Sequence, residues 1–179
     1  MTNDLLNPPY NKISLQHQFY ITLYKNRKKL GINFDKIKIF TIVRNPYDRI
    51  ISDLFFHKLI TKYDSDEEVY HIIKNNYLNK NNLDNHNVPQ YKFITDENGN
   101  LIPNIKIFNT ETLNTSNNKL NKFLGFNIDI KKQNVNKDYG KYLNNKSIAL
   151  INKFYKKDFE LFKYIMIESK DFVLFKYVN

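Results

Sequence analysis

The stretch KIKIFTIVRNPYDRIISDLFFHKL, residues Lys36 to Leu59, predicts a strand that runs directly into a helix. Its apolar run Ile37 to Val43 is typical of a buried strand, and the apolar residues after Pro46 recur at helical spacing. Asn45 is a favourable N-cap, and Pro46 suits the first helical turn because its missing N–H has no carbonyl to bond there. We therefore expect Arg44 to lie where a strand ends and a helix begins.

A cation at such a junction predicts an anion-binding site. The first N–H groups of a helix are unpaired, the helix dipole is positive at this end, and a guanidinium can hold two phosphate oxygens at once. Ser52 follows eight residues after Arg44 and adds a hydroxyl donor on the same helix. The residues alone leave an equally weighted alternative, in which Arg44 pairs with a local carboxylate such as Asp48 and Ser52 faces solvent.

The composition indicates a folded, basic protein. The chain has 179 residues, 41% of them hydrophobic, and its 28 Lys and Arg against 18 Asp and Glu give a net charge of +10. This charge favours an anionic partner such as a nucleotide, an acidic glycan, a nucleic acid or a membrane surface, without choosing among them. The absence of Cys excludes disulfides and a thiolate nucleophile. Because no apolar run reaches about 18 residues and no signal peptide is evident, we expect a soluble, cytoplasmic protein without a membrane span.

Patterning along the chain predicts one α/β domain, residues 1–179, with a largely parallel sheet flanked by helices. Beyond the opening stretch, helices are expected over Lys12–Leu30, from Ser65 onward, over Thr115–Leu124 and over Asn145–Glu168; strands over Gln90–Ile94, Ile105–Phe108 and Phe172–Val178; and a hairpin turn at Asn98-Gly99. Polar loops are expected over residues 79–87 and 127–142, with an irregular arm over residues 1–10.

Several motifs resemble, in order, those of sulfotransferases that use 3′-phosphoadenosine 5′-phosphosulfate (PAPS), especially the carbohydrate-type branch. The opening stretch resembles that branch's F-x-x-V-R-[ND]-P-[YFW]-x-R-x-x-S segment, with Arg44 and Ser52 in register. Asp84 to Gln90 resembles D-x-H-W-x-P-Q, with Asn87 in place of the aromatic residue. Further matches are Phe93-Ile94-Thr95-Asp96 with Gly99, Ile107 to Leu113, Phe123-Leu124-Gly125, Asn134-Val135-Asn136 and Tyr155 to Tyr164, so that the resemblance is clearest over residues 36–164.

This resemblance implies a P-loop NTPase-like α/β fold with Arg44 and Ser52 on the 3′-phosphate of PAPS. It further implies transfer of a sulfuryl group to a hydroxyl, of a carbohydrate in this branch. His86, in a loop beside a family-like motif, is the candidate general base, because a neutral imidazole suits proton removal at physiological pH. The alternative, a loop His that only caps or packs, carries equal weight. Glu111 is expected to end a strand rather than to orient the site.

One family landmark is missing. A phosphosulfate loop resembling P-K-x-G-[TS]-[TS] normally follows the first strand, and neither this pattern nor G-x-x-x-x-G-K-[ST] occurs in the sequence. We therefore expect the first strand and the phosphate loop to be missing from the fold. Three explanations stay open: a partner chain supplies the loop, the chain is truncated, or the protein is a degenerate relative that still binds.

Whether the chain alone is an enzyme thus remains open, and the alternative function is a non-catalytic module that binds a nucleotide or an anionic glycan. A nucleic-acid binder is disfavoured because no recognition motif occurs. His17, His57 and His71 lie on predicted helices without metal-ligand spacing to a third partner, so no metal is expected.

Overall fold

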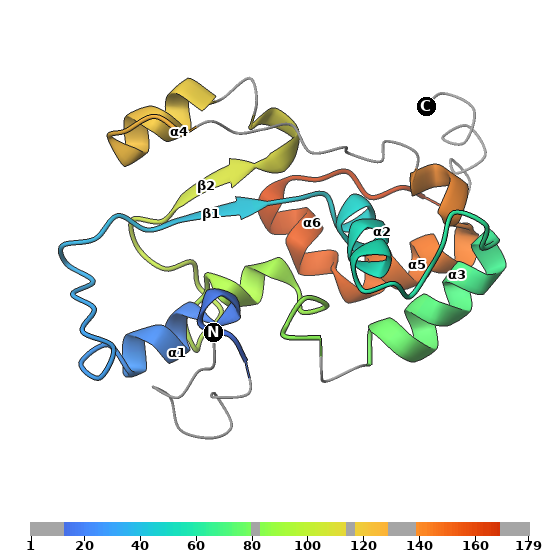
Figure 1. Ribbon diagram of the computed structural model, residues 1–179, viewed down its shortest axis with the longest axis horizontal. Coiled ribbons are helices and arrows are strands. Elements are labelled where there is room, and N and C mark those ends of the chain that lie inside the picture. The colour runs from blue at the N-terminus through green and yellow to red at the C-terminus, as the bar shows by residue number, and fades with distance from the viewer. Residues whose placement is uncertain (1–12, 80–82, 114–116, 129–138, 169–179) are drawn as a thin grey trace. The chain divides into compact units, whose positions relative to one another are not determined.

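The computed structural model describes residues 13–79, 83–113, 117–128 and 139–168 (Figure 1). The predicted arm 1–10 and strand 172–178 lie outside these residues. By their contacts the described residues form two compact units, the first within Met1–Val43 and Asn81–Lys131 and the second within Arg44–Lys80 and Lys132–Asn179. The single domain predicted from the sequence stays a prediction.

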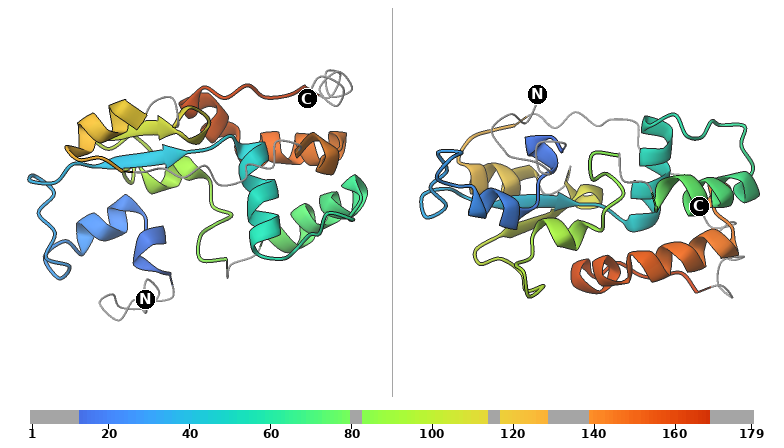
Figure 2. Two further views of the ribbon diagram at one scale, coloured as in Figure 1. Left: turned by 45° about the horizontal axis from the view of Figure 1, so that its top comes forward. Right: turned by 90° about the horizontal axis from the view of Figure 1, so that it is seen from below.

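The first unit is built on a small parallel sheet. Strand β1 (Phe40–Val43) pairs with β2 (Lys106–Asn109), with Phe40 opposite Lys106 and Val43 opposite Asn109. The two strands lie side by side in Figure 1 and Figure 2. Just past the sheet, the Thr110 hydroxyl donates to the Val43 carbonyl at 3.1 Å. The predicted parallel pairing is confirmed, although β1 begins three residues later than the apolar run does.

Helix α4 (Asn117–Leu124) contributes to a small core with β2. Phe108 and Leu120 are buried in it, and Phe123 packs edge-on against Phe108 and Phe40, with ring centroids 6.0 and 6.1 Å apart. Gly125, at φ +87°, stops the helix as predicted. The buried strand is only partly confirmed, since Phe40 and Ile42 are 39% and 42% exposed. Among the described residues the sheet has two strands, too few to cover both side chains.

The predicted helix over Lys12–Leu30 is wrong in extent. A 3-10 turn, η2 (Leu15–His17), and a six-residue helix, α1 (Tyr20–Lys25), replace it. The break falls at Gln18 and Phe19, whose backbones are extended, and the Gln18 side chain donates to the Ile13 carbonyl at 2.8 Å. Gly31, at φ +66°, closes the following turns, because Ile32 N–H donates back to the Arg27 carbonyl at 2.8 Å.

The predicted hairpin forms around its glycine, but its first strand does not. Thr95 and Leu101 form an antiparallel bridge, Asp96 N–H donates to the Asn100 carbonyl at 2.8 Å, and Gly99 adopts φ +80°. Residues Gln90–Phe93 form a 3-10 helix, η4, instead of a strand. After β2 the chain enters another 3-10 turn, η5 (Thr110–Thr112).

The second unit is helical. It contains α2 (Pro46–Phe56), α3 (Asp66–Ile72), the π-helical turn η3 (Ile73–Tyr77), the 3-10 turn η6 (Tyr139–Tyr142), α5 (Asn145–Phe154) and α6 (Lys156–Phe162). The predicted helix start at Ser65 is confirmed, and Ser65 forms a reciprocal capping box with Glu68. Buried side chains of α2, α5 and α6 form the core: Tyr47, Ile50, Ile51, Leu54, Ile148, Ile151, Phe159 and Phe162.

The long C-terminal helix predicted over Asn145–Glu168 is wrong in two places. It breaks at Tyr155, where the backbone leaves helical geometry (φ −104°, ψ 19°), and it ends at Lys163, which is left-handed at φ +60°. Ile165, which the sequence pattern places in the buried stripe, is 85% exposed. The segment after α6 is held by polar contacts, since Ile167 N–H donates to the Tyr47 hydroxyl at 2.9 Å and Asn152 donates to the Ile167 carbonyl at 2.9 Å.

Candidate functional site

The junction predicted from the opening stretch forms as expected. Strand β1 ends at Val43, and α2 begins at Pro46 with Asn45 as its N-cap. The Asn45 side chain accepts a hydrogen bond from Tyr47 N–H at 3.0 Å, and its carbonyl accepts from Arg49 N–H at 2.9 Å. Arg44 is therefore held immediately before the positive end of an eleven-residue helix.

Arg44 forms an ion pair with Asp48. Its Nε donates to the Asp48 carboxylate, and the two side chains are only 22% and 10% exposed. The local pairing that the sequence left open is thus present. The contact through Nε orients the guanidinium beside the start of α2. Ser52 is partly buried one turn beyond Asp48, on the same face of α2.

Arg49, in the first half of α2, lies near a buried polar cluster. The Tyr77 hydroxyl donates to Asp53 at 2.8 Å, and Tyr77 is fully buried. Burial raises the pKa of Tyr155, and the nearby Arg49 partly offsets this effect while Asp53 adds to it. Asp53 therefore takes part in an interior network of the second unit.

His86, the base predicted from the sequence, lies beside His17 in the first unit. Their rings meet edge to face with centroids 4.5 Å apart. Nδ1 of His17 lies 2.7 Å from Oδ2 of Asp84, and the same carboxylate accepts from the Ser14 hydroxyl at 2.6 Å and from the Ser14 N–H at 2.7 Å. The structure thus joins Ser14, His17, Asp84 and His86 into one cluster.

The Asp84 carboxylate is ionised in this cluster. Burial pushes its pKa up, but the hydrogen bonds from Ser14 and from His17 outweigh that effect and hold the pKa below its usual range. A charged carboxylate at Nδ1 favours the tautomer with a proton on that nitrogen, which makes Nε2 of His17 the acceptor. This is the arrangement that a general base requires.

The loop that carries Asp84 has an uncommon backbone conformation. Asp84 and Asn85 both adopt left-handed conformations, at φ +48° and +65°. Each such residue costs on the order of 1 kcal/mol relative to an ordinary conformation. The Asn85 side chain holds the loop in place by donating to the His17 carbonyl at 3.0 Å.

Sequence reasoning missed His17. The predicted helix over Lys12–Leu30 placed it in an apolar stripe, and 67 residues separate it from Asp84. The available signal was Asp84 itself, two residues before the predicted base, since a carboxylate there can position an imidazole. Glu111 lies on η5 directly after β2, as expected for a residue that ends a strand.

The described residues contain no group of three His, Cys, Asp or Glu side chains arranged to hold a metal ion. His71 instead lies 3.5 Å from Glu67 on α3, an exposed pair one helical turn apart. Within the same described ranges, no helix has both the length and the apolar character needed to cross a membrane.

The first strand of the parallel sheet is followed by Arg44 and then by a capped helix. This arrangement is typical of α/β proteins that bind anionic ligands. The comparisons identify the family: the model described as "Sulfotransferase family" matches residues 7–165. The chain therefore belongs to the sulfotransferase family, whose members transfer sulfuryl groups. No curated protein and no solved structure matched the chain.

Proposed function

We propose that this protein is a PAPS-dependent sulfotransferase that transfers a sulfuryl group to a hydroxyl of a carbohydrate. The cluster of His17, Asp84 and His86 in a chain of this family carries the proposal. Arg44 and Ser52 bind the 3′-phosphate of PAPS, and the histidine cluster accepts the proton.

The reaction balances without a metal or a redox partner. The acceptor oxygen forms a bond to sulfur while the bond from sulfur to the bridging phosphate oxygen breaks. The leaving adenosine 3′,5′-bisphosphate takes the electron pair of that bond, and the acceptor proton passes to an imidazole. Positioning the two substrates and stabilising charge on the sulfuryl oxygens supply most of the rate, as in phosphoryl transfer.

His86 is the base that the sequence predicts, and His17 is a second candidate that the structure adds. Asp84 orients His17 through Nδ1, whereas the ring of His86 contacts His17 edge to face. In the first assignment His86 removes the proton and His17 supports it, and in the second the roles are exchanged. Separate alanine variants distinguish the two assignments.

The sequence lacks a phosphosulfate-loop motif, and this motivates the second candidate function, a module that binds a nucleotide or an anionic glycan without turnover. Loss of one oxyanion donor costs about 100- to 1000-fold in rate in other enzymes. We propose that an active enzyme takes these donors either from a partner chain or from a longer form of this chain. The Arg44–Asp48 ion pair fits either function, because it orients the guanidinium in both.

Transfer of radiolabelled sulfate from PAPS to a panel of glycans separates these functions. The proposed enzyme transfers label, and the His17→Ala and His86→Ala variants lower that transfer. A chain that binds adenosine 3′,5′-bisphosphate but transfers no label, alone or with added extract of its source, is the binding module. A chain that transfers no label and binds neither the bisphosphate nor an anionic glycan contradicts both functions.

A further inference from the structure

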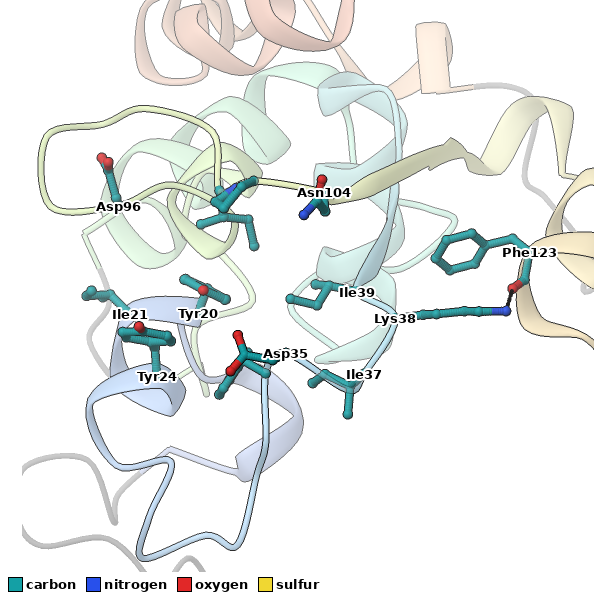
Figure 3. Close-up of a pocket in the computed structure, with 13 residues that line it drawn as sticks. Tyr20, Ile21, Tyr24, Asp35, Ile37, Lys38, Ile39, Asp96, Asn104 and Phe123 are labelled. Carbon is teal, nitrogen blue, oxygen red and sulfur yellow. Dashed lines mark hydrogen bonds between the residues drawn. The ribbon is translucent and has the colours of Figure 1, made fainter.

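The first unit contains a pocket of about 630 Å³ (Figure 3). None of its lining residues has a role in the proposed reaction. Helix α1, the segment leading into β1 and the segment leading into β2 line it. Its volume lies within the range of about 300–1,000 Å³ that is typical of small-molecule sites. The pocket therefore has the size to hold one or two sugar rings or a similar small molecule.

One side of the pocket is apolar and preorganised. Tyr20 stacks on Tyr24 with centroids 5.6 Å apart, and Phe34 meets both rings edge-on at 5.3 and 5.4 Å. Ile37 and Ile39 continue this lining along the segment before β1 (Figure 3). Because the three rings support one another, the wall needs little rearrangement to receive a ligand, and preorganisation of this kind lowers the cost of binding.

The polar groups of the pocket are mainly acceptors. Asp35 and Asp96 both line it, and Asp96 also holds the hairpin by accepting from the N–H groups of Asn98 and Asn100 at 2.9 and 2.8 Å. Lys38 lies at the other end, where its Nζ donates to the Phe123 carbonyl at 2.6 Å (Figure 3). The charged lining thus consists of two carboxylates and one ammonium, and Asp35 is the carboxylate that no hairpin N–H group engages.

Tyr20 supplies a neutral hydroxyl at this site. Burial raises its pKa, and the neighbouring Tyr24 and Asp35 raise it further, while Arg27 partly offsets them. The hydroxyl therefore stays protonated and can both donate and accept hydrogen bonds. An apolar wall with carboxylates and a hydroxyl matches a pyranose, which has an apolar face of C–H groups and a rim of hydroxyl donors. It disfavours an anionic sugar, because the Asp35 carboxylate would repel it.

We propose that this pocket binds an uncharged sugar unit of the acceptor. This inference rests on the proposed function and deepens it, since it names the charge class of the acceptor. Tyr20 is three residues beyond His17, so their Cα atoms are at most about 11 Å apart. The pocket therefore begins within the length of a disaccharide from the histidine cluster. The basic surface attracts anionic glycans in general, whereas the pocket selects a neutral unit.

Methyl-group NMR tests the proposal directly, because four isoleucines, Ile21, Ile37, Ile39 and Ile102, line the pocket. The probes are methyl β-glucopyranoside, the corresponding methyl glucuronide, which differs by one carboxylate, and phenol. We expect the glucoside to shift these four methyl signals with a Kd in the millimolar range, and the glucuronide to bind at least about 10-fold more weakly. Equal binding of the two sugars, or binding of phenol without the glucoside, would overturn the proposal.

Two variants test the pocket residues. Asp35→Asn removes one charge with little change in shape, so we expect the Kd values for the glucuronide and the glucoside to become more similar. Ile37→Ser shortens the apolar wall at a position that is 46% exposed in the free protein, so it should weaken glucoside binding without unfolding the unit. Glu160→Gln, which removes an exposed charge on α6, is the matched control. It should leave the affinities for the glucoside and for the glucuronide unchanged.

The nucleotide keeps this test separate from the proposed function. The melting shift caused by adenosine 3′,5′-bisphosphate should be the same in wild type, Asp35→Asn and Ile37→Ser. A normal nucleotide shift with no glucoside signal contradicts the pocket alone. Glucoside binding without any nucleotide shift contradicts the nucleotide site, and the pocket then stands without its assignment as the acceptor site.

Discussion

Nδ1 of His17 lies 2.7 Å from Oδ2 of Asp84, although 67 residues separate the two in the chain. This contact ties the segment before α1 to the loop that carries His86. It also fixes which nitrogen of His17 faces the carboxylate, so the other nitrogen is left to accept a proton. The candidate base is thus a cluster that the tertiary fold assembles.

The two imidazoles should differ in their importance for turnover. We expect substitution of the actual base by Ala to lower kcat for sulfate transfer by about 100- to 10,000-fold, with substitution of its neighbour having a smaller effect. Binding of adenosine 3′,5′-bisphosphate, measured by calorimetry, should be unchanged in both variants. His71→Ala, at a side chain 60% exposed in the second unit, is the control. Full activity of both the His17→Ala and His86→Ala variants would eliminate the cluster as the base.

Asp84→Asn should weaken the first unit and alter its response to acid. The carboxyl group has a lowered pKa when folded, so its stabilising effect is present above the unfolded value near 3.9 and is lost as the pH falls through the folded value. Since the side chain is 37% exposed, solvent screening limits the effect to about 1 kcal/mol at pH 7. Urea unfolding at pH 7 and below pH 3 measures it. A difference between wild type and variant that persists unchanged below pH 3 would show that the charge is not the cause.

Tyr77→Phe should destabilise the second unit by about 1–3 kcal/mol, because it removes the hydroxyl that donates to Asp53 at 2.8 Å in a buried site. Burial holds the pKa of Tyr77 well above its ordinary value, so the hydroxyl should remain a donor throughout the range in which the protein is handled. Chemical denaturation measures the loss. Tyr63→Phe, at a residue 82% exposed, should leave stability unchanged. If Tyr77→Phe has the same free energy of unfolding as Tyr63→Phe, the contact with Asp53 contributes nothing to stability.

Asn45→Ala should cost about 0.5–2 kcal/mol, the usual range for loss of an N-cap, because Tyr47 N–H then loses its acceptor. Asn45→Ser keeps a capping oxygen and should recover most of the loss. If Ser proves as damaging as Ala, some interaction other than the cap explains the effect. Thermal unfolding of the three proteins, followed by circular dichroism, gives the comparison.

Local signals in the sequence predicted the junction around Arg44 well, because a cap, a proline and a change of periodicity act over a few residues. The same kind of signal predicted the helix start at Ser65, the hairpin turn at Gly99 and the helix end at Gly125. The prediction of one helix over Lys12–Leu30 was wrong because contacts between residues distant in sequence determine the local structure there. The Asp84 carboxylate accepts a hydrogen bond from the Ser14 N–H, and the backbones of Gln18 and Phe19 are extended.

The candidate site was predictable only in part for the same reason. Arg44 and Ser52 belong to one short contiguous motif and His86 to another, and each motif can be identified from its own stretch of sequence. The pairing of His17 with Asp84 and the pocket beside α1 depend on which segments fold together, which periodicity does not encode. The break at Tyr155 belongs to this class as well, since the side chain of that residue joins a buried polar cluster rather than a continuous helical stripe.

Binding of adenosine 3′,5′-bisphosphate to wild type and to Arg44→Lys tests the central claim, that Arg44 binds the 3′-phosphate. At a ligand concentration of about 100 times the Kd, we expect stabilisation of about 2.7 kcal/mol, or a rise of about 5–10 °C in Tm. Lys keeps a cation beside Asp48 but loses the bidentate fork, so the Kd should rise about 30-fold and the Tm shift should fall to about 2–3 °C. Arg27→Lys, the matched control in the other unit, should retain the full shift. A full shift in Arg44→Lys, or none in wild type, would contradict the account.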